Sequence, residues 1–273
     1  MRKLNGLELQ VIEEYLSGQT PKELGLKYGT SNVTIYNTLI RHGISRRNPH
    51  EAKLRYPYDE HFFDKIDTEQ KAYVLGLWYA DGTNHESTNS IHLCLKDVDL
   101  VYTVKALFDT EHPVYTSRTD YAAFVLHGKH ISSTLARLGC RQQKSLTATF
   151  PTEMQVPKEL MPHFIRGYFD GDGCIHIRKQ GWNKVVHICG TEAFLSTMAT
   201  YLPVRSFLRP RHKKPIWFLA IYRMEDIDQF RDWMYLGATV WLERKRFLFF
   251  KQNPVLAAGE SFSPYPRGET ARP

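Results

Sequence analysis

Two copies of one pattern place an aspartate where an apolar helix is expected to end. The copies are YVLGLWYADG, residues 73–82, and FIRGYFDGDG, residues 164–173. Each ends in an Asp-Gly pair, and glycine suits the left-handed position that follows many helices. A carboxylate at that end is disfavoured by about 0.3–1 kcal/mol, because the helix terminus carries partial negative charge. A single aspartate of this kind could simply belong to a turn, but two copies in matching context predict a functional role for Asp81 and Asp172.

Small residues predict that these two helices touch. Gly76 and Ala80 are four residues apart, as are Gly167 and Gly171. This spacing lies on one helical face, where small side chains let two backbones approach closely. The two aspartates would then meet at the foot of the helix pair and repel each other. A divalent cation would relieve the repulsion, oxygen ligands suit Mg²⁺, and metal-assisted phosphodiester cleavage is the matching chemistry.

The segments that follow the two Asp-Gly pairs also repeat. Strands are expected in SIHLCLK, AAFVLHG, CIHIRKQ, VVHICGT and IWFLAIYR. Helices are expected in DVDLVYTVKALFD, HISSTLARLG, TEAFLSTMATYL and MEDIDQFRDWMYLG. The order of these elements is the same after each pair. An internal repeat of this kind predicts two similar halves related by a pseudo-two-fold axis.

Three short helices are predicted between residues 7 and 44. The first carries apolar residues at helical spacing, namely Leu9, Ile12, Tyr15 and Leu16. The second begins at Thr20 and Pro21, and the third begins at Thr30 or Ser31. The predicted inner stripe of the third helix is Val33, Tyr36, Leu39 and Ile40. Two short helices joined by a Gly-containing turn indicate a helix-turn-helix module over residues 1–45.

The outer face of the third helix favours DNA. Its candidate contacts to bases and phosphates are Asn32, Thr34, Asn37 and Arg41. Residues 1–55 hold nine Lys and Arg against five Asp and Glu, within a chain of net charge +7. Such an excess points to a polyanionic partner. The alternative is an ordinary three-helix module with a solvated polar face.

Residues 46–61 are predicted to be a basic linker. This segment is polar and contains two prolines. Arg46 and Arg47 are candidates to follow a DNA backbone, and a plain solvated linker is the alternative. The tail, residues 252–273, is rich in Pro, Gly and Ser and is expected to be disordered.

Composition excludes several classes of protein. The 273 residues are 42% hydrophobic and 24% charged, enough to bury a real core. No run of about 18 apolar residues exists, so no membrane span is expected. The four cysteines, Cys94, Cys140, Cys174 and Cys189, contain no Cys-x-x-Cys pair. They are expected to be reduced thiols in a cytoplasmic protein.

The second copy, IRGYFDGDG, resembles the motif of the LAGLIDADG homing endonucleases. The first, VLGLWYADG, departs from that motif at Tyr79, where the pattern often has an acid. The resemblance covers about residues 60 to 250. It implies an α+β fold of two αββαββα halves, residues 62–150 and 151–251. Their sheets would form a DNA-binding saddle, with the motif helices at the central interface.

The resemblance implies a monomeric, site-specific double-strand DNA endonuclease with a long asymmetric target and no protein partner. Mg²⁺ would be held by Asp81 and Asp172, with Ala80 and Gly171 beside them, and Mn²⁺ or Ca²⁺ could replace it in binding. The expected role is homing of a mobile intron or free-standing gene. The expected compartment is the cytoplasm of a prokaryotic or phage-infected cell, with an organelle as the alternative.

The resemblance also places a lysine after the last helix of each half. Lys144 and Lys245 match that place and would stabilise charge that develops on the phosphate. A solvated surface lysine is the alternative. Further polar positions of the catalytic centre would fall near Lys96-Asp97 and near Thr191-Glu192.

Strand alternation predicts the side chains that face DNA. They are Thr83, His85, His92, Cys94, Lys96, Cys174, His176, Arg178, Gln180 and His187, with Arg118, Arg209 and Arg211 as further candidates. These residues would contact bases and phosphates in the major groove. Alternatively, Cys174, His176, His187 and Cys189 could cluster as a zinc site, although i, i+2 spacing on strands is not a usual zinc pattern.

Two other functions fit the same scaffold. One is a DNA-binding regulator without catalysis, although both acids are kept. The other is an intron maturase, which binds RNA and assists splicing. A helix-turn-helix module suits duplex DNA and so argues against RNA as the sole substrate.

Overall fold

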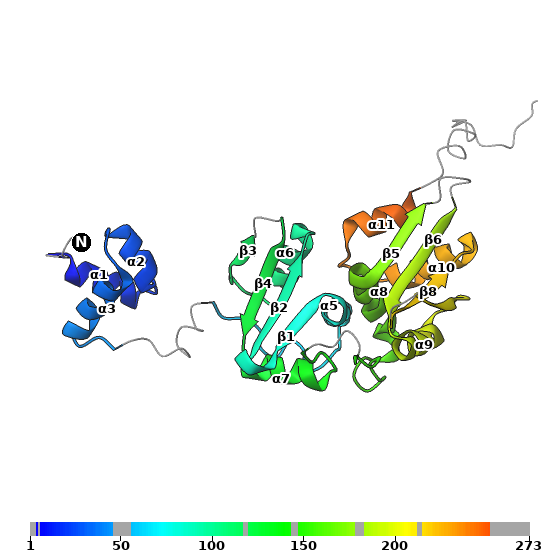
Figure 1. The fold of residues 1–273 in the computed structure, drawn as a ribbon, viewed down its shortest axis with the longest axis horizontal. Coiled ribbons are helices and arrows are strands. Elements are labelled where there is room, and N and C mark those ends of the chain that lie inside the picture. Colours follow the sequence, from blue (N-terminus) through cyan, green and yellow to red (C-terminus); the bar gives the residue numbers. More distant parts are fainter. Residues whose placement is uncertain are drawn as a thin grey trace, which may run out of the picture. The chain divides into compact units, whose positions relative to one another are not determined.

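The protein is described from a computed structural model, which covers residues 4, 6–45, 56–116, 120–142, 147–177, 183–211 and 215–251. The chain divides into two compact units, Met1–Tyr58 and Asp59–Pro273 (Figure 1). The tail predicted over 252–273 and most of the predicted linker, residues 46–55, lie outside the described residues. None of the described helices is long and apolar enough to cross a membrane.

The smaller unit consists of α1 (Glu8–Leu16), α2 (Pro21–Lys27) and α3 (Asn32–Arg41). Helix α2 begins with a capping box, in which the Thr20 side chain accepts from the Glu23 N–H and Glu23 accepts from the Thr20 N–H. Helix α3 begins at Ser31, whose hydroxyl accepts from the Thr34 N–H at 3.1 Å. These caps satisfy N–H groups that helix starts leave open. The three predicted helices are therefore present.

The core of the smaller unit differs in phase from the prediction. It contains Leu4, Val11, Tyr15, Leu24, Ile35 and Leu39. Leu9 and Leu16, two of the apolar residues at helical spacing in α1, are 77% and 65% exposed. Val33 and Ile40 are 60% and 57% exposed, so their predicted place on the inner stripe of α3 is wrong. The inner stripe of α3 is Ile35, Thr38 and Leu39, because these residues face α1 and α2. Val33 and Ile40 consequently share the outer face with Asn37.

The larger unit repeats one arrangement of elements. The first half contains α5 (Glu69–Ala80), β1 (Gly82–His85), β2 (Ser90–Leu95), α6 (Val98–Leu107), β3 (Val114–Thr116), β4 (Ala122–His127) and α7 (Lys129–Arg137). The second contains α8 (Met161–Asp172), β5 (Gly173–Ile177), β6 (Lys184–Gly190), α9 (Glu192–Tyr201), β7 (Phe207–Pro210), β8 (Trp217–Ile221), α10 (Met224–Tyr235) and α11 (Glu243–Phe250). Short 3-10 helices lie at Glu86–Thr88 and Lys158–Leu160.

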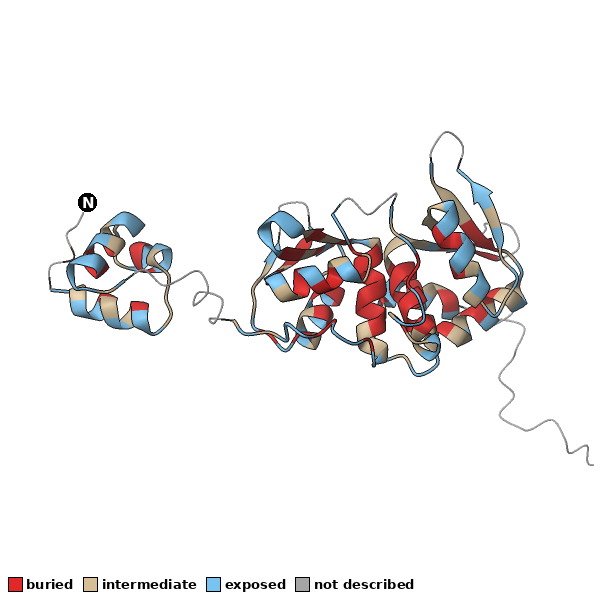
Figure 2. Ribbon diagram, turned by 90° about the horizontal axis from the view of Figure 1, so that it is seen from below, coloured by how far each residue is buried: buried red, intermediate tan, exposed pale blue. Residues whose placement is uncertain are grey.

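The two sheets have the same topology. Each has four antiparallel strands, in the orders β1-β2-β4-β3 and β5-β6-β8-β7. Helices cover one face of each sheet and form a second layer (Figure 2). The predicted α+β class with two αββαββα halves is confirmed. Helix α11 was not predicted, because its apolar residues do not follow one helical stripe and packing against β5 positions it.

Helices α5 and α8 form the centre of the larger unit, where buried residues run along both (Figure 2). A Cβ added to Gly76 would lie 2.0 Å from the Phe164 carbonyl oxygen, and one on Gly167 would lie 1.9 Å from that of Tyr73. No side chain fits in either place, so only glycine allows this backbone contact. The predicted contact between the two motif helices is confirmed.

A buried charge network fastens this helix pair. Arg166 on α8 is fully buried and donates to the Glu69 carboxylate of α5 at 2.5 Å. It also donates to the carbonyls of Met234 and Val240 and to His163 Nδ1, at 2.7, 3.0 and 2.6 Å. Because a buried guanidinium needs partners for all its donors, this network fixes α5, α8 and the end of α10 together.

The imidazole of His163 makes this network sensitive to acid. Burial, followed by the charge of Arg166, lowers the pKa of His163 to about 4. The unfolded chain, with an ordinary pKa near 6.5, therefore binds more protons between these values, and stability falls as the pH drops through this window. We expect His163→Asn, which keeps an acceptor toward Arg166, to remove this dependence. Relative to the variant, the native protein should lose roughly 3 kcal/mol between a pH above 6.5 and a pH of about 4.

Chemical denaturation of both proteins across this range measures the difference, and other titrating groups cancel in the comparison. If the difference in free energy of unfolding between the two proteins did not change with pH, His163 would not be buried in its neutral form.

Candidate functional site

The two motif aspartates lie at the adjoining ends of α5 and α8. Asp81 is the residue that ends α5, and its N–H donates to the Leu77 carbonyl at 2.9 Å. Asp172 is the last residue of α8. A Cβ on Gly171 would lie 2.3 Å from the Ala80 Cβ and 2.8 Å from Asp81 Oδ2. The Asp81 carboxylate therefore packs against the residue before Asp172, as the small-residue pattern predicted.

The glycines after the aspartates have a different purpose from the predicted one. Neither Gly82 nor Gly173 has a positive φ, and Gly173 is extended, at φ −90° and ψ 160°. A Cβ on Gly82 would lie 2.3 Å from the Trp78 ring, and one on Gly173 would lie 2.1 Å from the Phe169 ring. The left-handed assignment is wrong: each glycine makes room for an aromatic ring one turn earlier in its own helix.

Both aspartates act electrostatically on Tyr168. Burial raises the pKa of Tyr168 first, and the charges of Asp172 and Asp81 add to it. The Tyr168 hydroxyl donates to the Cys189 carbonyl at 2.9 Å. Burial also raises the pKa of the Cys189 thiol, and Asp172 raises it further. Tyr168 thus lies within electrostatic reach of both carboxylates.

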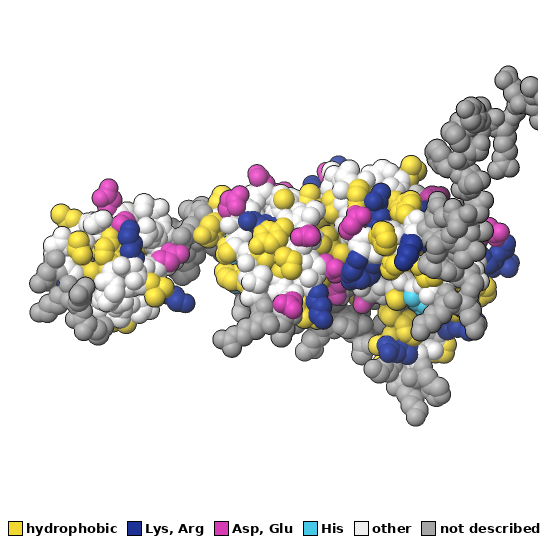
Figure 3. Space-filling model, turned by 90° about the horizontal axis from the view of Figure 1, so that it is seen from above, with side chains coloured by type: hydrophobic (Ala, Val, Ile, Leu, Met, Phe, Trp, Pro, Cys, Tyr) yellow, Lys and Arg dark blue, Asp and Glu magenta, His cyan; other side chains and the backbone are white. Residues whose placement is uncertain are grey.

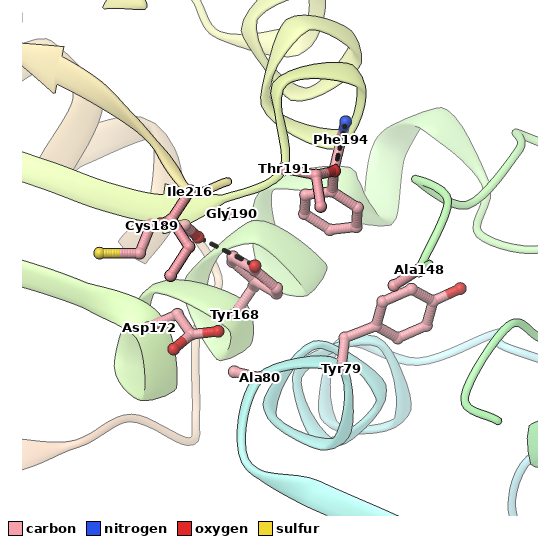
Figure 4. A pocket seen from close by; sticks show the side chains of 10 residues that line it. All are labelled: Tyr79, Ala80, Ala148, Tyr168, Asp172, Cys189, Gly190, Thr191, Phe194 and Ile216. Atoms are coloured by element: carbon pink, nitrogen blue, oxygen red, sulfur yellow. Dashed lines mark hydrogen bonds between the residues drawn. The ribbon is translucent and has the colours of Figure 1, made fainter. Parts of the chain in front are cut away.

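A pocket of about 180 Å³ opens beside Asp172. Figure 4 shows Asp172 on α8 and Ala80 on α5 along one side, with Thr191 and Phe194 at the start of α9 on the other. The Thr191 hydroxyl caps α9 by accepting from the Phe194 N–H at 3.3 Å. Of the loosely predicted pair Thr191-Glu192, only Thr191 lines this pocket, and its hydroxyl has a structural partner.

Lys245 supports the C-terminal end of α8. Its side chain is buried, with 4% of the residue exposed. The Nζ donates to the carbonyls of Phe169, Asp170, Gly171 and Gly173, at 2.7, 2.7, 3.2 and 2.6 Å. Burial lowers the pKa of Lys245 to about 8. The ammonium offsets the negative end of α8, the helix that carries Asp172. Sequence alone could not show this role, because α11 was not predicted.

Tyr79 and Asp170 occupy equivalent places in the two motifs. The Tyr79 hydroxyl donates to the Leu138 carbonyl at the end of α7. The Asp170 carboxylate accepts from the Leu242 N–H at 2.8 Å, just before α11, and from the Tyr73 hydroxyl at 2.8 Å. Each residue therefore joins its motif helix to the segment after a later helix of the same half. Tyr79 thus makes a connection in the first half equivalent to that of Asp170 in the second.

Asp170 is buried, with 3% of the residue exposed, and it differs in this from Asp81 and Asp172. Burial raises the pKa of Asp170 to about 6, although Tyr73 and Lys245 oppose the change. Its Oδ1 is buried without a hydrogen-bond partner among the described residues. Asp170 is consequently a structural acid, not a ligand facing solvent.

Arg244 links the two halves beside Asp81. It donates twice to Asp97, at 2.7 and 2.9 Å, and its side chain is 60% exposed. The Asp97 bond raises the pKa of Arg244, and the charges of Asp170 and Asp81 add to the effect. Asp97 belongs to the loosely predicted Lys96-Asp97 pair. The sequence did not indicate that Asp97 pairs with Arg244, because the two residues are 147 positions apart.

Those strand residues predicted to face DNA that the structure describes lie on the sheet faces that the helices leave open. Register pairs Thr83 with His92 and Cys174 with His187. The rings of His85 and His92 are 4.5 Å apart, and those of His176 and His187 are 5.4 Å apart. Each half thus presents a histidine pair at the same place after its aspartate. Burial lowers the pKa of His92, and His85 and His127 lower it further.

Aromatic rings support the cations on these faces. Lys96 lies over Tyr121, Arg209 over Tyr222 and Arg211 over Phe218, at 5.3, 5.5 and 5.6 Å from the ring centroids. Sequence reasoning found the cations and missed the rings, since the partners lie on other strands or loops. In the view of Figure 3, Lys and Arg side chains of the larger unit gather mainly over the second half.

Several predicted residues fall outside the described parts of the chain. They are Arg46, Arg47, Arg118, Lys144, Arg178 and Gln180. In the smaller unit, Asn32, Asn37 and Arg41 are exposed, while the Thr34 hydroxyl lies 3.0 Å from that of Ser31. The outer face of α3 also exposes Val33 and Ile40, which the sequence analysis had assigned to the core.

The alternative zinc cluster on the strands is not supported. Cys174 Sγ lies 3.9 Å from His176 Nδ1. However, the one group of three or more His, Cys, Asp or Glu ligand atoms within 4.8 Å of one another, in the described parts of the chain, is His61, Asp64 and His130.

The chemistry of the donor set fits Mg²⁺ at the foot of the helix pair. Asp81 and Asp172 supply carboxylate oxygens, which this ion prefers. The Gly171 carbonyl already accepts from Lys245 Nζ at 3.2 Å, and a carbonyl oxygen has a second lone pair. The two carboxylates are therefore the main donors that the chain offers there.

Comparison with known proteins rests on structure. No protein-family profile and no curated protein matches the chain. Among solved structures, it is similar to meganuclease I-SmaMI bound to uncleaveable DNA, at 11% identity and a TM-score of 0.48, over 64% of this chain and 86% of that one. It is also similar to the I-LtrWI LAGLIDADG homing endonuclease bound to target DNA, at 12% identity and a TM-score of 0.47, over 66% of this chain and 88% of that one. A third similar structure is LAGLIDADG meganuclease I-AabMI bound to uncleaved DNA, at 9% identity and a TM-score of 0.48, over 71% of this chain and 92% of that one. These values describe a likeness of fold and assign no function to this chain.

Proposed function

We propose that this protein is a Mg²⁺-dependent, site-specific double-strand DNA endonuclease of the homing type. The observation that carries the proposal is the pair Asp81 and Asp172 at the adjoining ends of two helices in backbone contact. Such a placement brings two like charges together at negative helix ends. A divalent cation bound between the two carboxylates is the simplest explanation for this placement.

The division of labour at this centre follows from the contacts. When bound, Mg²⁺ would supply charge stabilisation at the phosphate and an activated water. Asp81 and Asp172 would hold it. Lys245 fixes the α8 end through four carbonyls, and Arg244 holds Asp97 of the other half.

The open faces of the two sheets suit a long asymmetric DNA site. They lie on either side of the central helix pair, and each carries one histidine pair. They differ in their cations: Lys96 lies in the first half, whereas Arg209 and Arg211 lie in the second. Because a repeated scaffold with different side chains contacts different bases, we expect the two half-sites to differ in sequence.

The smaller unit is proposed to add contacts on the same DNA. Its α3 exposes Asn37 and Arg41 together with Val33 and Ile40. Asn pairs with adenine edges, and apolar side chains contact thymine methyl groups. We therefore expect α3 to favour A·T pairs in the major groove.

Deletion of residues 1–55 should weaken DNA binding at least about tenfold or broaden site recognition, because a basic module and its phosphate contacts are lost. Cleavage of DNA that is fully bound should remain. Gel-shift titration on the target and on variant sites measures both properties. Asn37→Ala should lose specificity, whereas Glu13→Gln, on exposed α1, should change nothing. Unchanged affinity and specificity in the deletion would refute this role.

One experiment separates the proposal from its two rivals. Duplex DNA and structured RNA pools are selected for binding, and the bound fraction is then incubated with Mg²⁺. An endonuclease selects duplex DNA and cuts it. A regulator selects duplex DNA and leaves it intact, and a maturase selects RNA.

A further inference from the structure

Three potential metal ligands converge in the first half of the larger unit, on segments that do not carry the motif aspartates. His61 and Asp64 lie in the segment before α5, and His130 lies in the first turn of α7. Asp64 Oδ2 is 2.7 Å from His61 Nδ1, and Asp64 Oδ1 is 2.6 Å from His130 Nε2. Ligand atoms of the three residues all lie within 4.8 Å of one another.

Burial of apolar surface does not explain why the imidazoles of His61 and His130 lie together. Their ring centroids are 4.5 Å apart, and the side chains of His61 and His130 are 63% and 38% exposed. Burial of ring surface therefore does not account for the contact. The one other polar neighbour of the carboxylate among the described residues is the Thr134 hydroxyl, 3.4 Å from Asp64 Oδ1. Glu60 lies 3.8 Å from His61 Nε2.

We propose that His61, Asp64 and His130 form a binding site for a divalent transition-metal ion of the zinc type. Two imidazoles and one carboxylate are a usual set of three protein ligands for Zn²⁺, with a further position open to water. Ligands of a tetrahedral Zn²⁺ are about 3.3 Å apart, given Zn–N distances near 2.0 Å, so small side-chain movements suffice. Imidazole selects zinc, cobalt or nickel over Mg²⁺, which prefers oxygen ligands.

The ion would fasten the start of the larger unit. His61 and Asp64 lie a few residues after the boundary between the units, and His130 lies about seventy residues later. A metal that bridges them closes a long loop, which is the arrangement in which a cross-link restricts the unfolded chain most. The site would thus fix the point from which the connection to the smaller unit emerges.

The test uses Co²⁺ as a spectroscopic substitute for Zn²⁺. The full chain, carrying Asp81→Asn and Asp172→Asn to remove the proposed Mg²⁺ centre, is dialysed against EDTA and titrated with Co²⁺. We expect one equivalent to bind, with visible absorption, no strong near-ultraviolet thiolate band and displacement by Zn²⁺ but not by excess Mg²⁺. Zn²⁺ should also raise the midpoint of thermal unfolding.

Asp64→Asn and His130→Ala should each abolish saturable Co²⁺ binding and the thermal shift. The matched control is His85→Ala/His92→Ala, which removes a histidine pair with the same 4.5 Å ring separation that belongs to no group of three ligands among the described residues. This control should bind Co²⁺ normally. Absence of saturable binding in the parent chain would overturn the proposal, as would binding that survives Asp64→Asn. Neither result would bear on DNA cleavage, since the background already lacks the motif acids.

Discussion

Asp172→Asn abolishes double-strand cleavage and leaves DNA binding intact: this is the result we expect from the position of Asp172 at the foot of the helix pair. The substitution keeps the size of the side chain and removes the charge that holds the cation. A bound metal contributes several kcal/mol to the transition state, so we expect a loss of at least about 10³-fold. Removal of a negative charge beside a phosphate does not weaken binding. Single-turnover cleavage and gel-shift titration measure the two quantities.

Asp81→Asn should have the same effect, because the two carboxylates share one environment around Tyr168. Asp99→Asn is the matched control, since Asp99 is an exposed acid in the first turn of α6. It should cleave at the native rate. Retained cleavage in Asp172→Asn would refute the assignment of the metal ligands, even if the protein proves to be a nuclease.

Lys245→Met should destabilise the larger unit by at least about 1–3 kcal/mol, the usual cost of leaving a buried polar group without its hydrogen-bond partner. Three carbonyl oxygens at the end of α8, and that of Gly173 at the start of β5, would lose their donor, and unmatched buried acceptors are costly. Cleavage should fall as well, because Asp172 sits on the part of the helix that loses its support. Chemical denaturation measures the first effect, and single-turnover cleavage at saturating DNA measures the second.

Arg244→Met is the natural comparison, because Arg244 is the adjacent residue on α11. Its exposed pair with Asp97 should contribute no more than about 1 kcal/mol to stability. A Lys245→Met protein as stable as the native one, but inactive, would show that Lys245 acts on the phosphate and is not a helix cap. Loss of both properties would support the positioning role.

The parts of this fold that sequence predicted are those determined by local pattern. Gly76 and Gly167 indicated helices in backbone contact, because no other residue type fits such an approach. The alternation in CIHI and SIHLCL placed His176, His92 and Cys94 on an open face. The repeat order of the elements predicted two halves of equal topology. Each of these inferences needed only neighbouring residues and a known period.

Other features depended on contacts between distant segments and could not be predicted in the same way. The hydrogen bonds of Lys245 require α11, which has no clear apolar stripe and is positioned by β5. The pair Arg244–Asp97 joins the two halves. In the smaller unit, Leu39 was placed correctly on the inner stripe of α3, but only packing against α1 and α2 selects Ile35 over Val33 and Ile40. Gly82 and Gly173 were predicted to adopt the left-handed conformation, but the close packing of an aromatic ring explains why glycine is needed at both positions.

The measurement that tests the central claim most directly is a map of DNA ends. Purified protein is incubated with a pool of long duplex DNA, with Mg²⁺ or with EDTA, and new ends are located by sequencing. Asp81→Asn/Asp172→Asn is treated in parallel. The account predicts recurrent, paired ends at one sequence that require Mg²⁺ and vanish in the double variant. The same ends with EDTA or with the double variant would contradict it, as would their absence from a pool that contains a site the protein binds.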